Sequence, residues 1–148
     1  MKAVLKIAKT SLVLTAFCFI NAGISYACTC IGPGDAKEAL ELSKAVFSGR
    51  VVKSNEYGAE VELETVWKGK FTTARVTVFN PAPNTSCSIK LKKGERYIVF
   101  STTDKERGRV SYIMQICFPT SVLSKAEQTL KEIGEGTPSR KPRRRLKT

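Results

Sequence analysis

Alternation of polar and apolar residues dominates the middle of the chain. It is clearest over residues 57–67, where three glutamates alternate with Val61, Leu63 and Thr65, the period of two expected of a half-buried strand. Four further segments, bounded by turn residues, are rich in β-branched and aromatic residues; they are 45–53, 74–79, 95–101 and 110–116. Five strands with short connections predict a mainly β domain, a small closed or nearly closed antiparallel barrel. A β-sandwich is the alternative.

Helix signals flank the strands on both sides. Asp35 and Glu38 have the spacing of a capping box and predict a short N-terminal helix. Ser124 and Glu127 repeat that spacing, and the apolar positions that follow at helical intervals lead to Gly134, a suitable C-cap. We therefore expect one helix before the strands and one after them.

The N-terminal segment has the pattern of a signal peptide. Three lysines precede an apolar run over residues 11–20, and Ser25-Tyr26-Ala27 supplies the small residues of a cleavage site. The run is shorter than the ~20 residues that span a membrane. We expect cleavage of residues 1–27, so that Cys28 becomes the first residue of a secreted or periplasmic protein. A signal-anchor helix and a lipid on Cys28 are the alternatives.

Charge separates the body of the chain from its C-terminal end. The 148 residues carry a net charge of +12, but residues 28–136 hold 16 basic and 13 acidic residues. Residues 137–148 contain two prolines, six positive charges and no apolar periodicity, so we expect a basic disordered tail. The predicted organisation is a signal peptide (1–27), one domain (28–136) and this tail, which either binds an anionic polymer or surface or serves only as a solubilising end.

Composition also limits the chemistry. The chain has no histidine, which excludes Ser-His-Asp and Cys-His hydrolases and imidazole metal ligands. We expect no enzymatic activity and no cofactor of its own. Export and disulfides argue against a nucleic-acid partner. Four basic residues are candidates for an anionic partner, with a solvated charged strand edge as the other interpretation; they are Lys90, Lys92, Lys93 and Arg96.

Four cysteines remain after the predicted cleavage, at positions 28, 30, 87 and 117. An even number in an exported chain indicates two disulfides. A bridge between Cys28 and Cys30 closes too small a ring for normal disulfide geometry. Two connectivities remain, and both tie the mature N-terminus to distant parts of the chain. A four-thiolate zinc site and a redox-active Cys28-Thr29-Cys30 pair are the alternatives.

Four features of the chain occur together. They are Cys28-Thr29-Cys30 at the mature N-terminus, a five-stranded pattern, a mid-chain cysteine in a loop and a last cysteine after the fifth strand. This combination resembles the netrin-like superfamily of OB-fold domains. Within it the chain is most similar to the inhibitory N-terminal domain of the tissue inhibitors of metalloproteinases. Segments 66–69 (VWKG) and 94–99 (GERYIV) also resemble strand-end and strand-start sequences of that family. The resemblance covers residues 28–133 and implies an OB-fold-like barrel with the pairs Cys28–Cys87 and Cys30–Cys117.

The resemblance also implies a function and its residues. In the family, the N-terminal amine and the carbonyl oxygen of the first cysteine chelate the zinc of a target protease, and the next side chain enters the specificity pocket of that enzyme. Carried over, Cys28 is the zinc-chelating residue, and Thr29, Cys30 and Ile31 are inhibitory contacts. The expected partner is a secreted zinc metalloproteinase, whose zinc is the only metal involved, and the expected state is a monomer. The alternative is a secreted netrin-like binding module without inhibitory activity.

Overall fold

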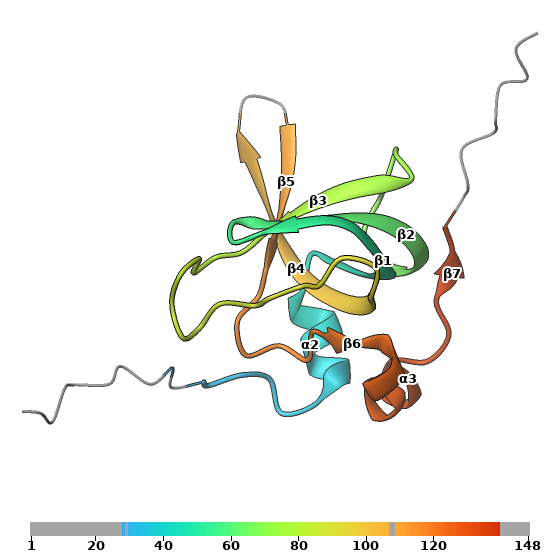
Figure 1. Ribbon diagram of the computed structural model, residues 1–148. Coiled ribbons are helices and arrows are strands. Elements are labelled where there is room, and N and C mark those ends of the chain that lie inside the picture. Colours follow the sequence, from blue (N-terminus) through green and yellow to red (C-terminus); the bar gives the residue numbers. More distant parts are fainter. Residues whose placement is uncertain (1–27, 29, 107–108, 140–148) are drawn as a thin grey trace, which may run out of the picture.

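A computed structural model describes residues 28, 30–106 and 109–139 of the chain (Figure 1). The predicted signal peptide over residues 1–27, Thr29 and the basic residues 140–148 lie outside the described residues. The described part forms a mainly β structure. Its helices, a 3-10 turn and its strands are α2 (Ala36–Leu42), β1 (Ala45–Asn55), β2 (Gly58–Lys68), β3 (Arg75–Phe79), β4 (Arg96–Glu106), β5 (Arg109–Met114), β6 (Ser121–Val122), η1 (Leu123–Lys125), α3 (Glu127–Ile133) and β7 (Thr137–Pro138).

Strands β1 to β5 close into a barrel in the order β1-β2-β3-β5-β4, with β4 pairing back onto β1. This confirms the predicted OB-fold-like barrel. All of its pairings are antiparallel except that between β3 and β5, where Val78 lies opposite Tyr112 and Phe79 opposite Ile113 in parallel register. The closing edge of the barrel is therefore parallel, a detail that alternation along single strands does not reveal.

Strand β1 pairs with β2 on one edge and with β4 on the other, so it must curve strongly around the barrel. Its register with β2 shifts between Ser48 and Gly49. A Cβ atom on Gly49 would collide with the backbone oxygen of Glu62 on β2. Glycine therefore permits the close approach of two backbones where the strand bends.

The two faces of the sheet are buried in different ways. Phe47 and its inward-pointing neighbours fill the barrel interior, whereas Val46, Ile98 and Phe100 point to the opposite face and pack against Ala39 of α2 and residues around α3. The period of two explains this division, since adjacent residues of one strand face opposite sides. The helices thus cover one side of the barrel (Figure 1).

The N-terminal helix begins as predicted. The Asp35 side chain accepts a 2.7 Å hydrogen bond from the Glu38 backbone nitrogen, and the Glu38 carboxylate accepts one of 2.6 Å from the Gly34 nitrogen. Both bonds satisfy backbone donors close to the first turn. The ammonium group of Lys68 donates to the carbonyl oxygens of Leu40 and Glu41 at the other end of α2, which anchors the helix to β2.

The capping box predicted for the C-terminal helix, with Ser124 as its N-cap, is wrong. Ser124 lies inside the 3-10 turn η1, and α3 starts only at Glu127, after Ala126, whose side chain makes no capping hydrogen bond. Burial of Ala126 against the sheet, at 1% exposure, fixes the helix start where sequence spacing favoured a hydroxyl cap. The predicted end is confirmed, because the nitrogen of Gly134 bonds to the Leu130 carbonyl and its φ is 73°.

The expectation of a disordered tail from residue 137 is also wrong for its first residues. Thr137 and Pro138 form β7 and pair with β2, and the Ser139 nitrogen donates to the Glu64 carbonyl at 2.8 Å. Trp67 holds the approach to this strand, because its indole nitrogen donates to the Gly134 carbonyl at 2.7 Å. The ordered domain therefore extends through Ser139.

We expect Trp67→Phe to lower the free energy of unfolding by about 1 kcal/mol, because it removes one hydrogen bond and keeps most of the aromatic packing. The measurement is urea denaturation combined with amide hydrogen exchange. Exchange at Ser139 should accelerate strongly. Exchange in β4 should accelerate only by the amount that the lower global stability explains. Unchanged exchange at Ser139 would show that the indole does not anchor β7.

Candidate functional site

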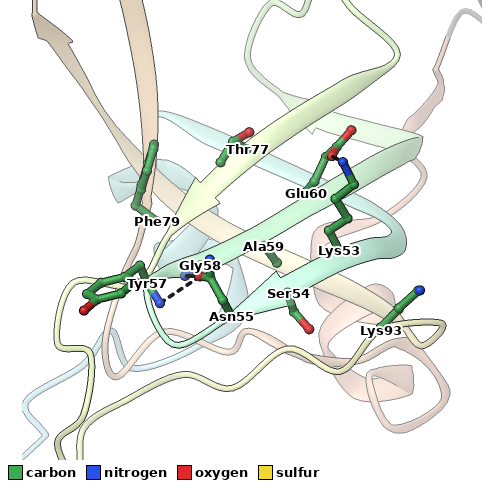
Figure 2. A pocket seen from close by; sticks show the side chains of 10 residues that line it. All are labelled: Lys53, Ser54, Asn55, Tyr57, Gly58, Ala59, Glu60, Thr77, Phe79 and Lys93. Atoms are coloured by element: carbon green, nitrogen blue, oxygen red, sulfur yellow. Dashed lines mark hydrogen bonds and ion pairs between the residues drawn. The ribbon is translucent and has the colours of Figure 1, made fainter.

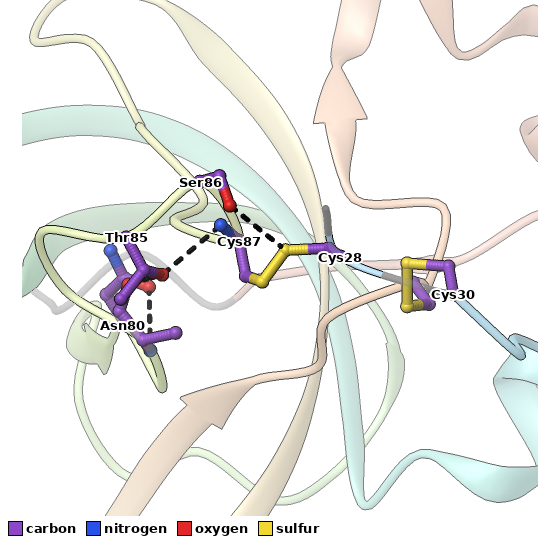
Figure 3. The surroundings of a disulfide bond; sticks show 8 residues. Cys28, Cys30, Asn80, Thr85, Ser86 and Cys87 are labelled. Carbon is purple, nitrogen blue, oxygen red and sulfur yellow. Dashed lines mark hydrogen bonds between the residues drawn. A yellow bond between two sulfur atoms is a disulfide. The ribbon is translucent and has the colours of Figure 1, made fainter. Parts of the chain in front are cut away.

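Two disulfides hold the start of the described chain against the barrel. Cys28 pairs with Cys87 and Cys30 with Cys117, with Cα–Cα distances of 5.6 and 5.3 Å (Figure 3). The pairing implied by the family resemblance is confirmed. Because every one of these cysteines is bonded to a distant partner, the four-thiolate zinc site and the Cys28–Cys30 redox pair are both wrong.

Cys87 lies in the loop between β3 and β4, and Asn80 organises the start of that loop. The Asn80 side chain, 7% exposed, donates to the Glu56 carbonyl at 3.1 Å and to the Ser88 hydroxyl at 2.7 Å. The Thr85 hydroxyl accepts from the Cys87 nitrogen at 3.2 Å (Figure 3). These bonds tie the loop to the β1–β2 turn, so the first disulfide is attached to an ordered segment.

Cys117 follows β5 and has a left-handed backbone with φ of 69°. Gly32 packs directly on it, since a Cβ atom on Gly32 would collide with the Cys117 carbonyl oxygen. The chain is therefore fixed at Cys30 by the disulfide and at Gly32 by backbone contact. The side chain between these points, Ile31, is 95% exposed.

The predicted contact residues thus form one short surface segment. Cys28 is half-buried and its sulfur lies 3.7 Å from the Ser86 hydroxyl oxygen, whereas Cys30 and Ile31 are exposed. Thr29, between the two cysteines, lies outside the described residues. An almost fully exposed isoleucine on a pinned backbone is unusual for a side chain of this size, because apolar area of this kind is favourably removed from water on contact. We call residues 28–31 the N-terminal ridge.

Sequence reasoning missed two residues that support the ridge. These residues are Asn80 and Gly32. The Asn80-Pro81 dipeptide is a turn signal that could have identified the first. Nothing in the sequence alone shows that Gly32 contacts Cys117, because these residues meet only when the second disulfide forms.

A shallow pocket of about 560 Å³ lies at the β1–β2 turn (Figure 2). Tyr57 and Phe79 line it and are 55% and 43% exposed. The Asn55 side chain accepts from the nitrogens of Tyr57 and Gly58 at 2.9 and 3.1 Å and so fixes the turn. Phe79 points away from the barrel interior, whereas its neighbour Val78 on β3 points inward.

No three His, Cys, Asp or Glu side chains gather into a metal-binding group in the described part of the chain. In the same residues, no helix is long and apolar enough to cross a membrane. Two disulfides fit an extracellular or otherwise oxidising compartment. In comparisons with known proteins, no family model and no curated protein matches the chain.

Removal of the second disulfide in a Cys30→Ala, Cys117→Ala double variant should destabilise the fold by ~2–5 kcal/mol, because an 87-residue separation is no longer constrained in the unfolded chain. The measurement is guanidinium denaturation of the oxidised proteins. Ile31 should become mobile on the nanosecond timescale, since the second disulfide no longer holds Gly32 against the backbone of residue 117. Unchanged stability with an equally rigid Ile31 would show that other contacts hold this segment.

Proposed function

We propose that the protein is a secreted inhibitor of zinc metalloendopeptidases, acting through the N-terminal ridge with Cys28 as its first residue. The observation that carries the proposal is the double pinning of Cys28 and Cys30 beside an Ile31 that is 95% exposed. The predicted signal peptide and the two disulfides support a secreted or periplasmic location. The resemblance to the tissue inhibitors of metalloproteinases supplies the target class.

The chemistry of such a ridge follows from its first residue. A catalytic zinc keeps three protein ligands and one open position, which is occupied by the water that attacks the substrate. The α-amine and the carbonyl oxygen of Cys28 are two metal-binding atoms of one residue, on either side of its Cα atom. Together they can replace that water. The inhibitor then occupies the substrate cleft without presenting a bond that the water can attack.

Rigidity favours this mode of binding. A free N-terminal peptide would lose backbone and side-chain freedom on entering a cleft, at a cost of roughly 1–2 kcal/mol for each ordered residue. Here the disulfides at Cys28 and Cys30 and the contact between Gly32 and Cys117 order the segment before it meets a partner. More of the contact energy is then available for affinity.

The other side chains of the ridge would contact different parts of the protease cleft. In this proposal Thr29 enters the specificity pocket of the protease, as the resemblance implies, and Ile31 packs against the rim of the cleft. The alternative is a netrin-like binding module, for which the exposed Tyr57 and Phe79 at the β1–β2 turn would be the contact surface. The two proposals differ in whether the free amine of Cys28 matters.

We expect a protein with one alanine added before Cys28, or with the Cys28 amine acetylated, to lose inhibition by at least about a hundredfold, because the amine is then displaced or cannot donate a lone pair. The assay is the residual activity of a panel of secreted zinc metalloendopeptidases. The control is the thermal midpoint and the disulfide map, which should match those of the protein that begins at Cys28. Equal inhibition by both forms would refute chelation, and no inhibition by either form would favour the binding module.

The same mechanism gives a pH dependence. An α-amine titrates at ~7.7–8.0, and only its neutral form binds zinc, so acidification forces the metal to displace a proton. The inhibition constant should rise by up to about tenfold for each pH unit below that range. A hydroxamate inhibitor assayed on the same enzyme corrects for changes in the protease itself. A flat corrected profile from pH 5 to 8 would argue against the amine as a ligand.

Thr29→Arg tests the specificity-pocket contact separately. An arginine placed in an apolar pocket buries a charge without a partner, at a cost of several kcal/mol, so inhibition of enzymes with apolar pockets should fall by more than about tenfold. Thr29→Val keeps the size of the side chain and serves as the matched control. If the two variants inhibit equally well, residue 29 does not enter the pocket.

A further inference from the structure

A basic groove lies apart from the N-terminal ridge, between the loop before β4 and the segment around β6. Its volume is about 560 Å³, and it is lined by Lys90 and Lys92 from the first segment and Lys125 from the second. All three side chains are exposed. In the described part of the chain, none of them forms an ion pair. Two segments that lie up to 35 positions apart in the sequence, from Lys90 to Lys125, thus place three positive charges without ion-pair partners around one groove.

The groove is shaped by buried hydrogen bonds. The Tyr97 hydroxyl donates to the Glu95 carboxylate at 2.7 Å. It accepts a hydrogen bond from the backbone nitrogen of Lys92 at 3.2 Å. Burial and the bond to Glu95 raise the pKa of Tyr97 above its ordinary value, which favours the protonated hydroxyl that donates to Glu95. Glu95 is the one acidic residue among those lining the groove, and it is already engaged by this tyrosine. The loop that carries Lys92 is therefore held in place.

A second groove, of about 480 Å³, continues the positive surface on the other side of η1. It shares Glu95, Val122 and Ser124 with the first and adds Arg50 and Arg96. Arg96 is neutralised by Glu64, whose carboxylate lies 2.6 Å from its guanidinium, but Arg50 only donates one hydrogen bond to the Gly94 carbonyl. A positive strip therefore runs from Lys125 across Ser124 to Arg50.

The lining of the strip discriminates between classes of polyanion. The exposed large apolar side chains of the described residues are Ile31, Leu42, Tyr57, Phe79 and Val110, and none of them lines either groove. Membrane surfaces are bound by apolar side chains that insert beside basic ones. Single-stranded nucleic acid requires exposed aromatic platforms. Both of these features are missing from the described lining.

Hydroxyl groups complete the surface. Ser121 and Ser124 line the first groove beside the lysines, and their hydroxyls form no hydrogen bond within the described residues. A concave surface that offers ammonium groups and free hydroxyls matches a narrow chain that carries both anionic groups and hydroxyls. We propose that the strip from Lys125 to Arg50 binds a linear acidic polysaccharide, by ion pairs with the lysines and hydrogen bonds with the serines.

The test compares two triple variants of the full mature chain that carry the same net charge. Lys90→Gln, Lys92→Gln, Lys125→Gln removes the groove charges, and Lys37→Gln, Lys105→Gln, Lys131→Gln removes three exposed lysines elsewhere. The basic residues 140–148 are common to both, so their contribution cancels. Binding is measured by calorimetry with a heparin-derived oligosaccharide and with polygalacturonate, which distinguish sulfate from carboxylate as the anionic group.

We expect the groove variant to bind at least one of these polysaccharides about tenfold more weakly than the control variant, since it loses three exposed ion pairs, each of modest strength. Ser124→Trp should weaken binding similarly without changing the charge, because it fills the groove. Unchanged unfolding midpoints confirm that all variants fold. Equal weakening by both triple variants, or full binding by Ser124→Trp, would refute the proposal. So would groove-dependent binding that is confined to single-stranded DNA or to phosphatidylglycerol vesicles.

This inference does not rest on the proposed inhibition, because no protease is present in the assay. A chain extended before Cys28 should bind the polysaccharide as the unextended chain does, even where it no longer inhibits. Loss of polysaccharide binding on extension would place the anion at the ridge and would overturn the assignment to the groove.

Discussion

The parallel pairing of β3 with β5 is the constraint on which the candidate site depends. Parallel strands end at the same edge of a sheet, so the loop after β3 and the turn after β5 leave the barrel at the same end. Cys87 lies in that loop and Cys117 in that turn. Two cysteines separated by a single residue are at most ~7 Å apart, so both disulfides can form only where their partners lie at the same end of the barrel. The fold thereby makes a C-x-C motif into a doubly anchored ridge.

Barrel closure in turn depends on how β1 curves between two neighbours. Gly49 permits the approach to β2, and the register shifts around it allow one strand to pair with β2 and β4 together. Without that closure β3 and β5 would be opposite edges of an open sheet. The bend at Gly49 and the N-terminal ridge are thus linked through the closure of the barrel.

The sequence predicted the parts of this structure that depend on local chemistry. The alternation in β2, the Asp35 cap and the C-cap at Gly134 all arise from neighbouring residues. The parts that failed depend on contacts between distant residues. Helix α3 starts at Glu127, and not after Ser124, because Ala126 is buried against the sheet.

The tail and the ridge illustrate the same division. Residues 137–139 have no strand pattern of their own, and they are ordered by the Glu64 carbonyl and the indole of Trp67. The C-x-C motif identified the ridge, but its orientation depends on Gly32 lying against Cys117 and on Asn80 linking two loops. Short segments that are ordered only by contacts with distant residues have no hydrophobic periodicity of their own. Their structure is therefore visible only in the folded protein.

One loop connects the two proposed surfaces. Residues 80–92 carry Cys87, which fixes the ridge, and Lys90 and Lys92, which line the basic groove. Bonds from Asn80 and the Cys28–Cys87 disulfide order the first part of this loop, and the bond from the Lys92 nitrogen to Tyr97 orders its end. Coupling between two ligands requires an element whose state each of them can change. Because the loop is held at both ends before either ligand binds, the two surfaces should act independently, and a polysaccharide in the groove would localise the protein without altering the ridge.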